Sequence, residues 1–225
     1  GDWMSKEDER RLLSACDSLV AIREDDGEAF ARLLPEKRVL IAPPSFRPAP
    51  GAGAPEPHRC LFVAGDAEAN REGIAWFIEH AWPLVRDAIP GAELHLCGTV
   101  CRIFSTDAPG VILRGFVDDL EAEYAKAAVV IVPLLRGSGV KIKLLEALAH
   151  SKACVTTPIG SEGLPVLESC VLQAASPEEF ANRTLRLLTE PDTRRRLEES
   201  ALRVIGEHFS PAACYGPLYE HIIRP

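Results

Sequence analysis

The sequence lacks any apolar stretch long enough to cross a membrane. Its longest apolar run covers residues 127–135, whereas a helix that spans a bilayer needs roughly 20 apolar residues. It also shows no charged and apolar leader segment. We therefore expect a cytoplasmic protein with no transmembrane segment.

An excess of basic residues is also missing. The chain has 25 Lys and Arg residues against 33 Asp and Glu residues, which gives a net charge of −8. A nucleic-acid-binding surface needs a basic patch or stripe. The sequence therefore predicts no nucleic-acid partner.

The cysteines form no recognisable framework. There are seven of them, an odd number, and no Cys-x-x-Cys pair or neighbouring histidine accompanies them. A disulfide scaffold and a zinc site both need such spacing, so we expect no disulfides and no metal site. Cys97 and Cys154 lie in apolar runs, which predicts that they fill the core.

Several catalytic signatures are absent from the sequence. It contains no Gly-Lys-Ser/Thr, no Gly-x-Ser-x-Gly and no His-x-x-x-His, which disfavours a P-loop ATPase, a hydrolase with a nucleophile elbow and a metalloprotease. The pair Gly137 and Gly139 lacks the third glycine of a dinucleotide-binding fingerprint. A dehydrogenase is therefore disfavoured as well.

The chain does have the composition and pattern of an α/β protein. Its 225 residues, 47% hydrophobic and 26% charged, suit one full globular domain with an appendage. Apolar runs at strand length alternate with segments of helical periodicity, and this alternation predicts a Rossmann-like, doubly wound parallel sheet covered on both faces. The expected strands are 19–22, 38–42, 60–64, 93–97, 111–114, 129–134, 153–157 and 171–173. The expected helices are 6–19, 25–34, 73–86, 120–128, 140–150, 177–189, 192–207 and 211–223.

The same pattern predicts four parts of the chain. Residues 1–43 form a short α/β segment, and residues 44–58, rich in Pro and Gly, form an extended linker. Residues 59–209 form the main domain. Residues 210–225 form a C-terminal helix.

Glycines follow most of the predicted strands, at the edge of the sheet where doubly wound folds bind ligands. They are Gly65, Gly98, Gly115, Gly137 and Gly139. A glycine permits close approach of a ligand to the backbone, but it also permits a tight turn. The clustering of the five at one edge points to a ligand.

The strongest single element is the turn at 137–140, which leads into the helix expected at 140–150. The N-terminus of a helix favours an anion such as a phosphate, and Lys141 and Lys143 add positive charge. Two structural alternatives stay open, namely an ion pair between Lys143 and Glu146 and a solvated Lys141 at the helix end. Similarly, Asp118 and Asp119 are either paired carboxylates or the N-terminal charges of the helix at 120–128, and their position favours the second interpretation.

A series of short motifs runs through the main domain. They lie at 62–65 with 70 and 76–77, 98, 115–120, 133–134, 137–149, 155–157 and 162–164. Together, in their order and spacing over about 59–209, they resemble the C-terminal, nucleotide-sugar-binding domain of group 1, retaining glycosyltransferases of the GT-B fold. Residues 1–43 resemble the last part of the family's N-terminal, acceptor-side domain, and residues 210–225 resemble its terminal helix.

The resemblance implies a role for each matching position. Glu146 would bind the ribose hydroxyls of a nucleoside-diphosphate sugar, and the loop of Gly115, Phe116 and Val117, with Leu120, would lie beside the base. The residues that would face the diphosphate and the donor sugar are Gly137, Ser138, Gly139, Val140, Lys141 and Lys143, with Gly65 on the opposite side of the site. No metal ion and no cofactor are implied, because the lysines and the helix N-terminus supply the positive charge.

Two positions depart from the family pattern. Ser138 stands where many members have a glutamate, and Arg71 alone stands where many have an Arg and Lys pair. We therefore expect Lys141, Lys143 or both to hold the diphosphate.

The sequence favours transfer of a sugar from a nucleoside-diphosphate sugar to an acceptor that it does not identify. A catalytically inactive nucleotide-binding or scaffolding module of the same fold is the alternative, and a sugar-nucleotide epimerase is a weaker one. The donor base and sugar stay open, as does a homodimer that pairs through residues 1–43.

Overall fold

The computed structural model describes residues 4–102, 104–137 and 139–223, and it contains two compact units. Pro48–Gly206 forms the larger unit. The residues up to Arg47 and those from Glu207 onward form the smaller one. The larger unit contains nearly all of the predicted site residues, with Ser138 outside the described residues.

The larger unit is built on a six-stranded sheet in which every neighbouring pair of strands is parallel. The strand order is β5-β4-β3-β6-β7-β8, and this arrangement confirms the predicted α/β class. All four residues of β6 are buried, as expected for an apolar strand that is covered on both faces. The strands are β3 (Arg59–Val63), β4 (Glu93–Cys97), β5 (Val111–Gly115), β6 (Val129–Val132), β7 (Cys154–Thr156) and β8 (Val171–Gln173).

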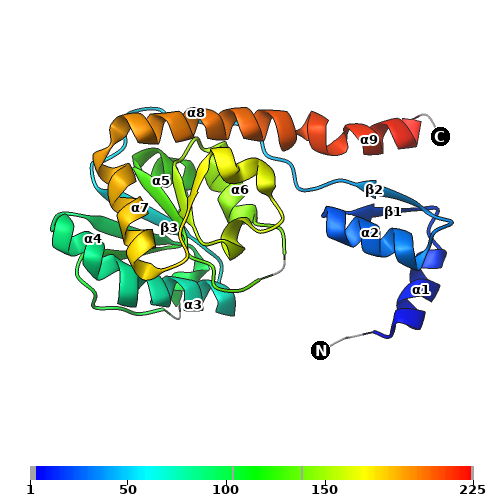
Figure 1. Ribbon diagram of the computed structural model, residues 1–225, viewed down its shortest axis with the longest axis horizontal. Coiled ribbons are helices and arrows are strands. Elements are labelled where there is room, and N and C mark those ends of the chain that lie inside the picture. The colour runs from blue at the N-terminus through cyan, green and yellow to red at the C-terminus, as the bar shows by residue number, and fades with distance from the viewer. Residues whose placement is uncertain (1–3, 103, 138, 224–225) are drawn as a thin grey trace. The chain divides into compact units, whose positions relative to one another are not determined.

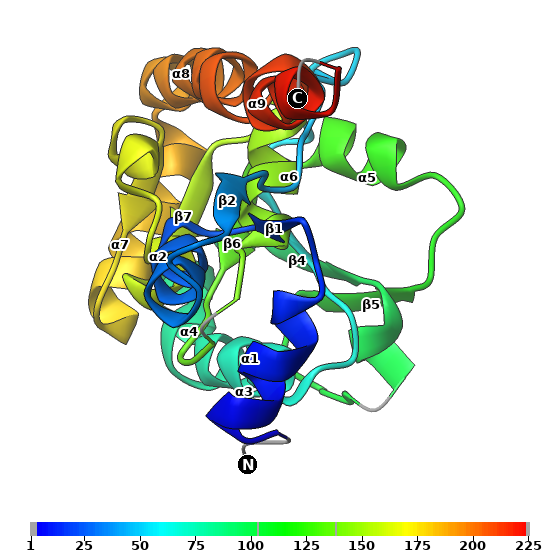
Figure 2. The ribbon, with the colours of Figure 1, turned by 90° about the vertical axis from the view of Figure 1, so that its right-hand side faces the viewer.

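Helices cover both faces of this sheet (Figures 1 and 2). One face packs against α3 (Glu68–Trp76), the π-helical turn η1 (Phe77–Ala81), α4 (Trp82–Ala88) and α7 (Pro177–Thr189), and the other packs against α5 (Leu120–Lys126) and α6 (Ile142–Ala149). The ring centroids of Phe77 and Phe180 lie 5.2 Å apart in the hydrophobic core beneath the first group of helices. The remaining helices of this unit are η2 (Thr99–Arg102), η3 (Ile159–Ser161), η4 (Pro165–Ser169) and α8 (Pro191–His208), of which the last two residues belong to the smaller unit.

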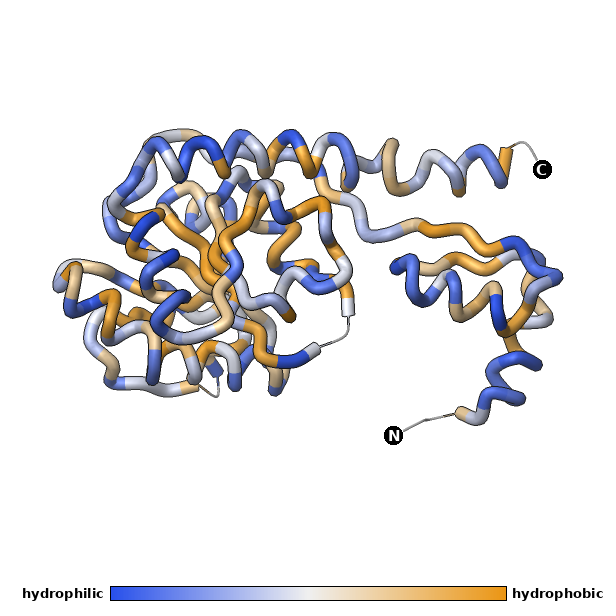
Figure 3. Tube along the Cα trace, viewed as in Figure 1, coloured by the Kyte–Doolittle hydropathy of each residue, from blue (hydrophilic) through white to orange (hydrophobic). Residues whose placement is uncertain are grey.

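Hydropathy follows the same layers (Figure 3). The strands of the large sheet are mainly hydrophobic, whereas α8 is mostly hydrophilic.

The start of α7 shows how the local sequence determines where a helix begins. The Ser176 hydroxyl accepts a hydrogen bond from the backbone N–H of Glu179 at 3.2 Å. This is the N-cap that the Ser-Pro-Glu-Glu sequence predicts.

The helix predicted at 73–86 differs from the structure in two ways. It begins earlier, at Glu68, and it is interrupted by η1. Pro83 lies at the start of α4 and has no N–H to donate to the carbonyl one turn before it. A π-helical turn widens the backbone at such a position and accommodates the proline ring.

The smaller unit contains a two-stranded parallel sheet. The helix α2 connects the two strands, and Ser18 Oγ lies 2.8 Å from His221 Nε2 on α9. The helix predicted at 6–19 is shorter, because α1 ends at Ser14 and a strand begins at Ser18. The elements of this unit are α1 (Lys6–Ser14), β1 (Ser18–Ala21), α2 (Glu24–Leu33), β2 (Arg38–Ile41) and α9 (Pro211–Ile223).

Residues 44–58 contain no helix and no strand, and the first boundary between the two compact units falls among them, after Arg47. All seven cysteines are free, and Cys97 and Cys154 are buried. Within the described ranges, no helix is both long and apolar enough to cross a membrane.

Candidate nucleotide-sugar site

The strand order of the large sheet places the candidate site between β3 and β6. These two strands are neighbours, and the chain runs outward from them in opposite directions along the sheet. At such a switch point the loops after the two strands separate and leave space for a ligand. The predicted residues Gly65 and Gly137 lie in these two loops.

The loop after β6 is fastened by a lysine. The Lys141 side chain is only 5% exposed, and its Nζ donates a hydrogen bond to the carbonyl oxygen of Gly137 at 2.7 Å. The interpretation of Lys141 as a solvated lysine at the helix end is therefore wrong. Its neighbour Ile142 begins α6, so the positive charge of Lys141 lies at the N-terminal end of that helix.

Lys143 adds a second positive charge in the first turn of α6. It is half-buried, and burial, followed by the nearby charge of Lys141, lowers its pKa. Among the described residues, Lys143 forms no salt bridge with Glu146, so the predicted alternative of an ion pair between them is wrong. The N-terminal end of α6 thus carries two cations, Lys141 at the N-cap and Lys143 in the first turn, together with the positive end of the helix dipole, and this arrangement attracts an anion.

The fold requires glycine at only one of the two glycine positions described in this loop. Gly137 has a φ of +133°, a conformation that side chains rarely adopt. Gly139 has no such angle, and a Cβ atom added to it meets no other atom within 4 Å. Nothing among the described residues therefore requires glycine at 139. A ligand that approached this backbone closely would require it, because a side chain would then be in the way. Ser138 lies outside the described residues.

Glu146 lies one turn further along α6 and is half-buried. Its Oε2 accepts a hydrogen bond from the Tyr124 hydroxyl at 3.2 Å. Tyr124 lies on α5 and is 1% exposed. The sequence analysis missed this tyrosine, because a pair 22 positions apart leaves no signal in local periodicity.

The loop after β5 connects the sheet to α5. Gly115 has a φ of +70°, and its carbonyl oxygen accepts a hydrogen bond from the backbone N–H of Gly98 at 2.7 Å. Phe116 is 77% exposed, so its ring is available to a ligand, and Val117 is half-buried. Leu120, also half-buried, begins α5.

The carboxylate of Asp119 caps α5. Its Oδ1 accepts a hydrogen bond from the backbone N–H of Ala122 at 2.9 Å. This confirms for Asp119 the predicted role as an N-terminal charge of the helix.

Two arginines near the switch point, one in the segment after β3 and one in the loop after β6, are paired with acidic residues. Arg71 forms an ion pair with Asp66. Arg136, directly before Gly137, reaches Glu68 at 2.8 Å and forms a second ion pair with Glu72. The sequence analysis missed the role of Arg136, which joins the β6 loop to α3 across the switch point.

Asn70 and Thr99 hold the loop after β3. The Asn70 side-chain amide donates to the carbonyl oxygen of Gly65 at 2.9 Å. The Thr99 hydroxyl accepts from the backbone N–H of Asp66, also at 2.9 Å. The backbone around Gly65 is therefore fixed in place by side chains that are polar but uncharged.

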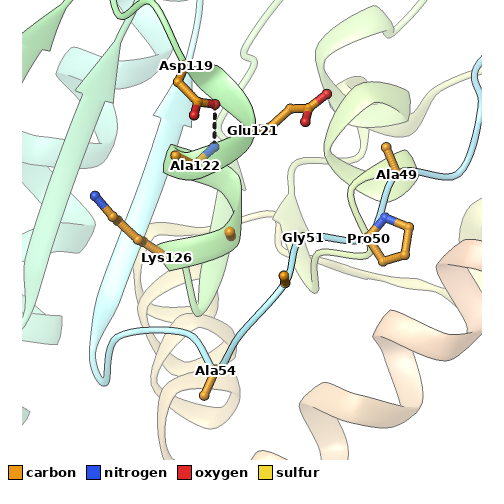
Figure 4. Close-up of a pocket in the computed structure, with 10 residues that line it drawn as sticks. Ala49, Pro50, Gly51, Ala54, Asp119, Glu121, Ala122 and Lys126 are labelled. Carbon is orange, nitrogen blue, oxygen red and sulfur yellow. Dashed lines mark hydrogen bonds between the residues drawn. The ribbon is translucent and has the colours of Figure 1, made fainter.

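A separate cavity of about 540 Å³ lies between α5 and the segment 49–54 (Figure 4). None of the predicted site residues lines it. Its walls are formed by Ala49, Pro50, Gly51, Ala52, Ala54, Asp119, Glu121, Ala122, Ala125 and Lys126. Across the described part of the chain, no three His, Cys, Asp or Glu residues lie close enough together to hold a metal ion.

Comparison with known proteins places this architecture in one family. The family described as "Glycosyl transferases group 1" matches residues 57–190. A curated relative, an uncharacterized 44.6 kDa protein in the cps region of Klebsiella pneumoniae, is 25% identical over 178 residues. The match covers 72% of this chain and 46% of the relative, so the chain spans about half the length of that relative.

Solved structures show the same fold. S. aureus TarM in a complex that contains UDP has a TM-score of 0.75 at 12% identity, over 99% of this chain and 47% of TarM. The pneumococcal O-GlcNAc transferase GtfA with UDP and GlcNAc has a TM-score of 0.73 at 11% identity, over 97% of this chain and 48% of GtfA. Anabaena HepE with UDP and glucose has a TM-score of 0.69 at 13% identity, over 99% of this chain and 68% of HepE.

The family match covers more than half of the chain, lies within the larger unit and agrees with the resemblance that the sequence motifs showed. The chain belongs to the group 1 glycosyltransferase family and has the fold of its GT-B members.

Proposed function

We propose that this chain binds a nucleoside-diphosphate sugar and takes part in the transfer of that sugar to an acceptor. The observation that carries the proposal is the cationic N-terminal end of α6, with Lys141 at the N-cap and Lys143 in the first turn, at the switch point of the sheet. A diphosphate leaving group gains negative charge as its bond to the sugar weakens, and fixed positive charge stabilises it. The family match and the UDP complexes of TarM, GtfA and HepE support this assignment.

The proposal gives each part of the donor a partner. The turn from Gly137 to Val140, with the two lysines, faces the diphosphate and the donor sugar, and Gly65 lies opposite. Glu146 accepts hydrogen bonds from the ribose hydroxyls. The loop of Gly115, Phe116 and Val117, followed by Leu120, lies beside the base. Because protein cations stand at the diphosphate position, we propose that binding needs no metal ion.

Calorimetric titration of the protein with UDP, GDP and ADP, each with and without magnesium, tests the proposal. We expect micromolar binding of one nucleotide, and UDP is the first candidate because the three structural neighbours hold it. The affinity should not change when magnesium is replaced by a chelator. Failure of all three nucleotides to bind would refute the proposed site.

The role of Lys143 has a sharper test. We expect Lys143→Met to weaken binding of the diphosphate by about 1.5–3 kcal/mol, the scale for a hydrogen bond to a charged group, and to leave binding of the bare nucleoside unchanged. Lys126→Met is the matched control, because it removes the same charge from an exposed position on α5. Equal losses for diphosphate and nucleoside would contradict the phosphate contact.

Glu146→Gln tests the other end of the donor. The neutral amide keeps the size of the side chain but accepts a weaker hydrogen bond from a ribose hydroxyl. We expect nucleoside and nucleoside diphosphate to lose about the same free energy of binding, on the order of 1 kcal/mol. A loss confined to the diphosphate would contradict a ribose contact.

A further inference from the structure

Tyr124 and Glu146 form a pair that joins α5 to α6. The Tyr124 hydroxyl donates to Glu146 Oε2 at 3.2 Å. A buried hydroxyl needs a hydrogen-bond partner, and Tyr124 is almost fully buried. Among the described residues, Glu146 forms no salt bridge, and Oε1 accepts no hydrogen bond. One oxygen of the carboxylate is therefore fixed by the protein, and the other is left for a ligand.

His150 holds the tyrosine ring from one side. The two rings are stacked, with centroids 4.3 Å apart and an angle of 13° between their planes. The His150 Nδ1 lies 3.1 Å from the carbonyl oxygen of Ala49, so Nδ1 carries the proton and donates it. The backbone N–H of Ala49 in turn donates to the carbonyl oxygen of Ala149 at 2.8 Å. The stack thus rests on a segment that is itself bonded to the end of α6.

The tyrosine stays a donor over the whole useful pH range. Burial, followed by the negative charge of Glu146, raises its pKa above the ordinary value. A tyrosine that keeps its proton donates to the carboxylate at all times. A glutamate side chain loses considerable rotamer freedom when a ligand orders it. If the carboxylate is already ordered before the ligand binds, this entropy loss no longer weakens the free energy of binding.

We propose that Tyr124 is a positioning residue, which orients the carboxylate of Glu146 so that Oε1 meets the ribose hydroxyls of the donor nucleotide. The inference rests on the proposed function and assigns a residue to it that contacts Glu146 rather than the substrate. His150 supports the orientation by stacking on the tyrosine ring.

The variant Tyr124→Phe tests this role, because it keeps the ring and the stack on His150 and removes only the hydroxyl. The probes are UDP and 2′,3′-dideoxy-UDP, or the matching GDP or ADP pair if that base binds. We expect the variant to bind the ribonucleotide about three- to tenfold more weakly, as for the loss of one hydrogen bond, and the dideoxynucleotide with unchanged affinity. In a Glu146→Gln background, Tyr124→Phe should cost less than about twofold, because coupled residues are not additive.

Tyr219→Phe is the matched control, since Tyr219 is 65% exposed on α9, and thermal melting of each variant verifies folding. Equal losses for the ribo- and dideoxynucleotide, or full additivity with Glu146→Gln, would overturn the positioning role and leave the proposed function intact. If the wild-type protein binds no nucleoside diphosphate, the proposed function and this inference fail together.

Discussion

The stability of the larger unit depends on a buried group of charges around Glu123 on α5. The side chains of Glu123 and Arg59 are only 5% and 6% exposed and form an ion pair. Arg114 reaches the other carboxylate oxygen at 3.3 Å. Glu56, which is half exposed, lies 2.8 Å from Arg59. Glu123 thus ties α5 to β3 and β5, and α5 carries the tyrosine that orients Glu146.

The variant Glu123→Gln removes the charge and keeps the shape of the side chain. Loss of one partner of a buried ion pair costs about 3–5 kcal/mol, because the remaining charge is left uncompensated. Glu56 still pairs with Arg59, so we expect the lower end of this range, about 3 kcal/mol. For a protein of this size, that change lowers Tm by about 6–12 °C.

Thermal and urea unfolding measure this difference directly. Glu121→Gln is the matched control, because Glu121 is exposed on the same helix and an exposed charge contributes less than about 0.5 kcal/mol. The reasoning is refuted if Glu123→Gln lowers Tm no more than Glu121→Gln does. A second expected consequence is weaker nucleotide binding by Glu123→Gln, since α5 loses its anchor to the sheet.

Two further predictions concern stability. Gly73→Ala in α3 should destabilise the protein by about 2 kcal/mol, because the new Cβ would lie 2.1 Å from the Pro133 carbonyl oxygen. Gly206→Ala in α8 has open space around it and should stabilise the protein by about 0.5–1 kcal/mol. Chemical denaturation measures both changes, and a stabilising Gly73→Ala would contradict the predicted steric clash. Burial raises the pKa of the Cys60 thiol from 9.0 to about 12, so the folded state holds a proton that the unfolded state releases, and this contribution to stability is lost as pH rises from about 9 to 12. Cys60→Ala should therefore flatten the fall in unfolding free energy over that range by about 1.4 kcal/mol per pH unit, and the exposed Cys16 provides the control; an unchanged slope for Cys60→Ala would contradict the linkage.

Local sequence signals were sufficient to predict most elements of the fold. The unbroken apolar run at 129–132 predicts a strand that is covered on both faces, and it is fully buried. Ser176 caps α7, because a cap depends on residues that are close together along the chain. The same holds for Asp119, whose place directly before a helix predicts its hydrogen bond to the backbone. The motifs between residues 62 and 164, taken together in their order and spacing, predicted the family that the comparison shows.

Only the tertiary structure decided which distant side chains meet. Arg136 pairs with Glu72, 64 positions away, and Tyr124 donates to Glu146 on another helix. The burial of Lys141 also depends on how neighbouring elements pack. Periodicity reports which face of an element is apolar, but the order of strands in the sheet determines which loops become neighbours. The sequence therefore determined the residue types of the candidate site, whereas the packed sheet and its helices determined which of these residues meet.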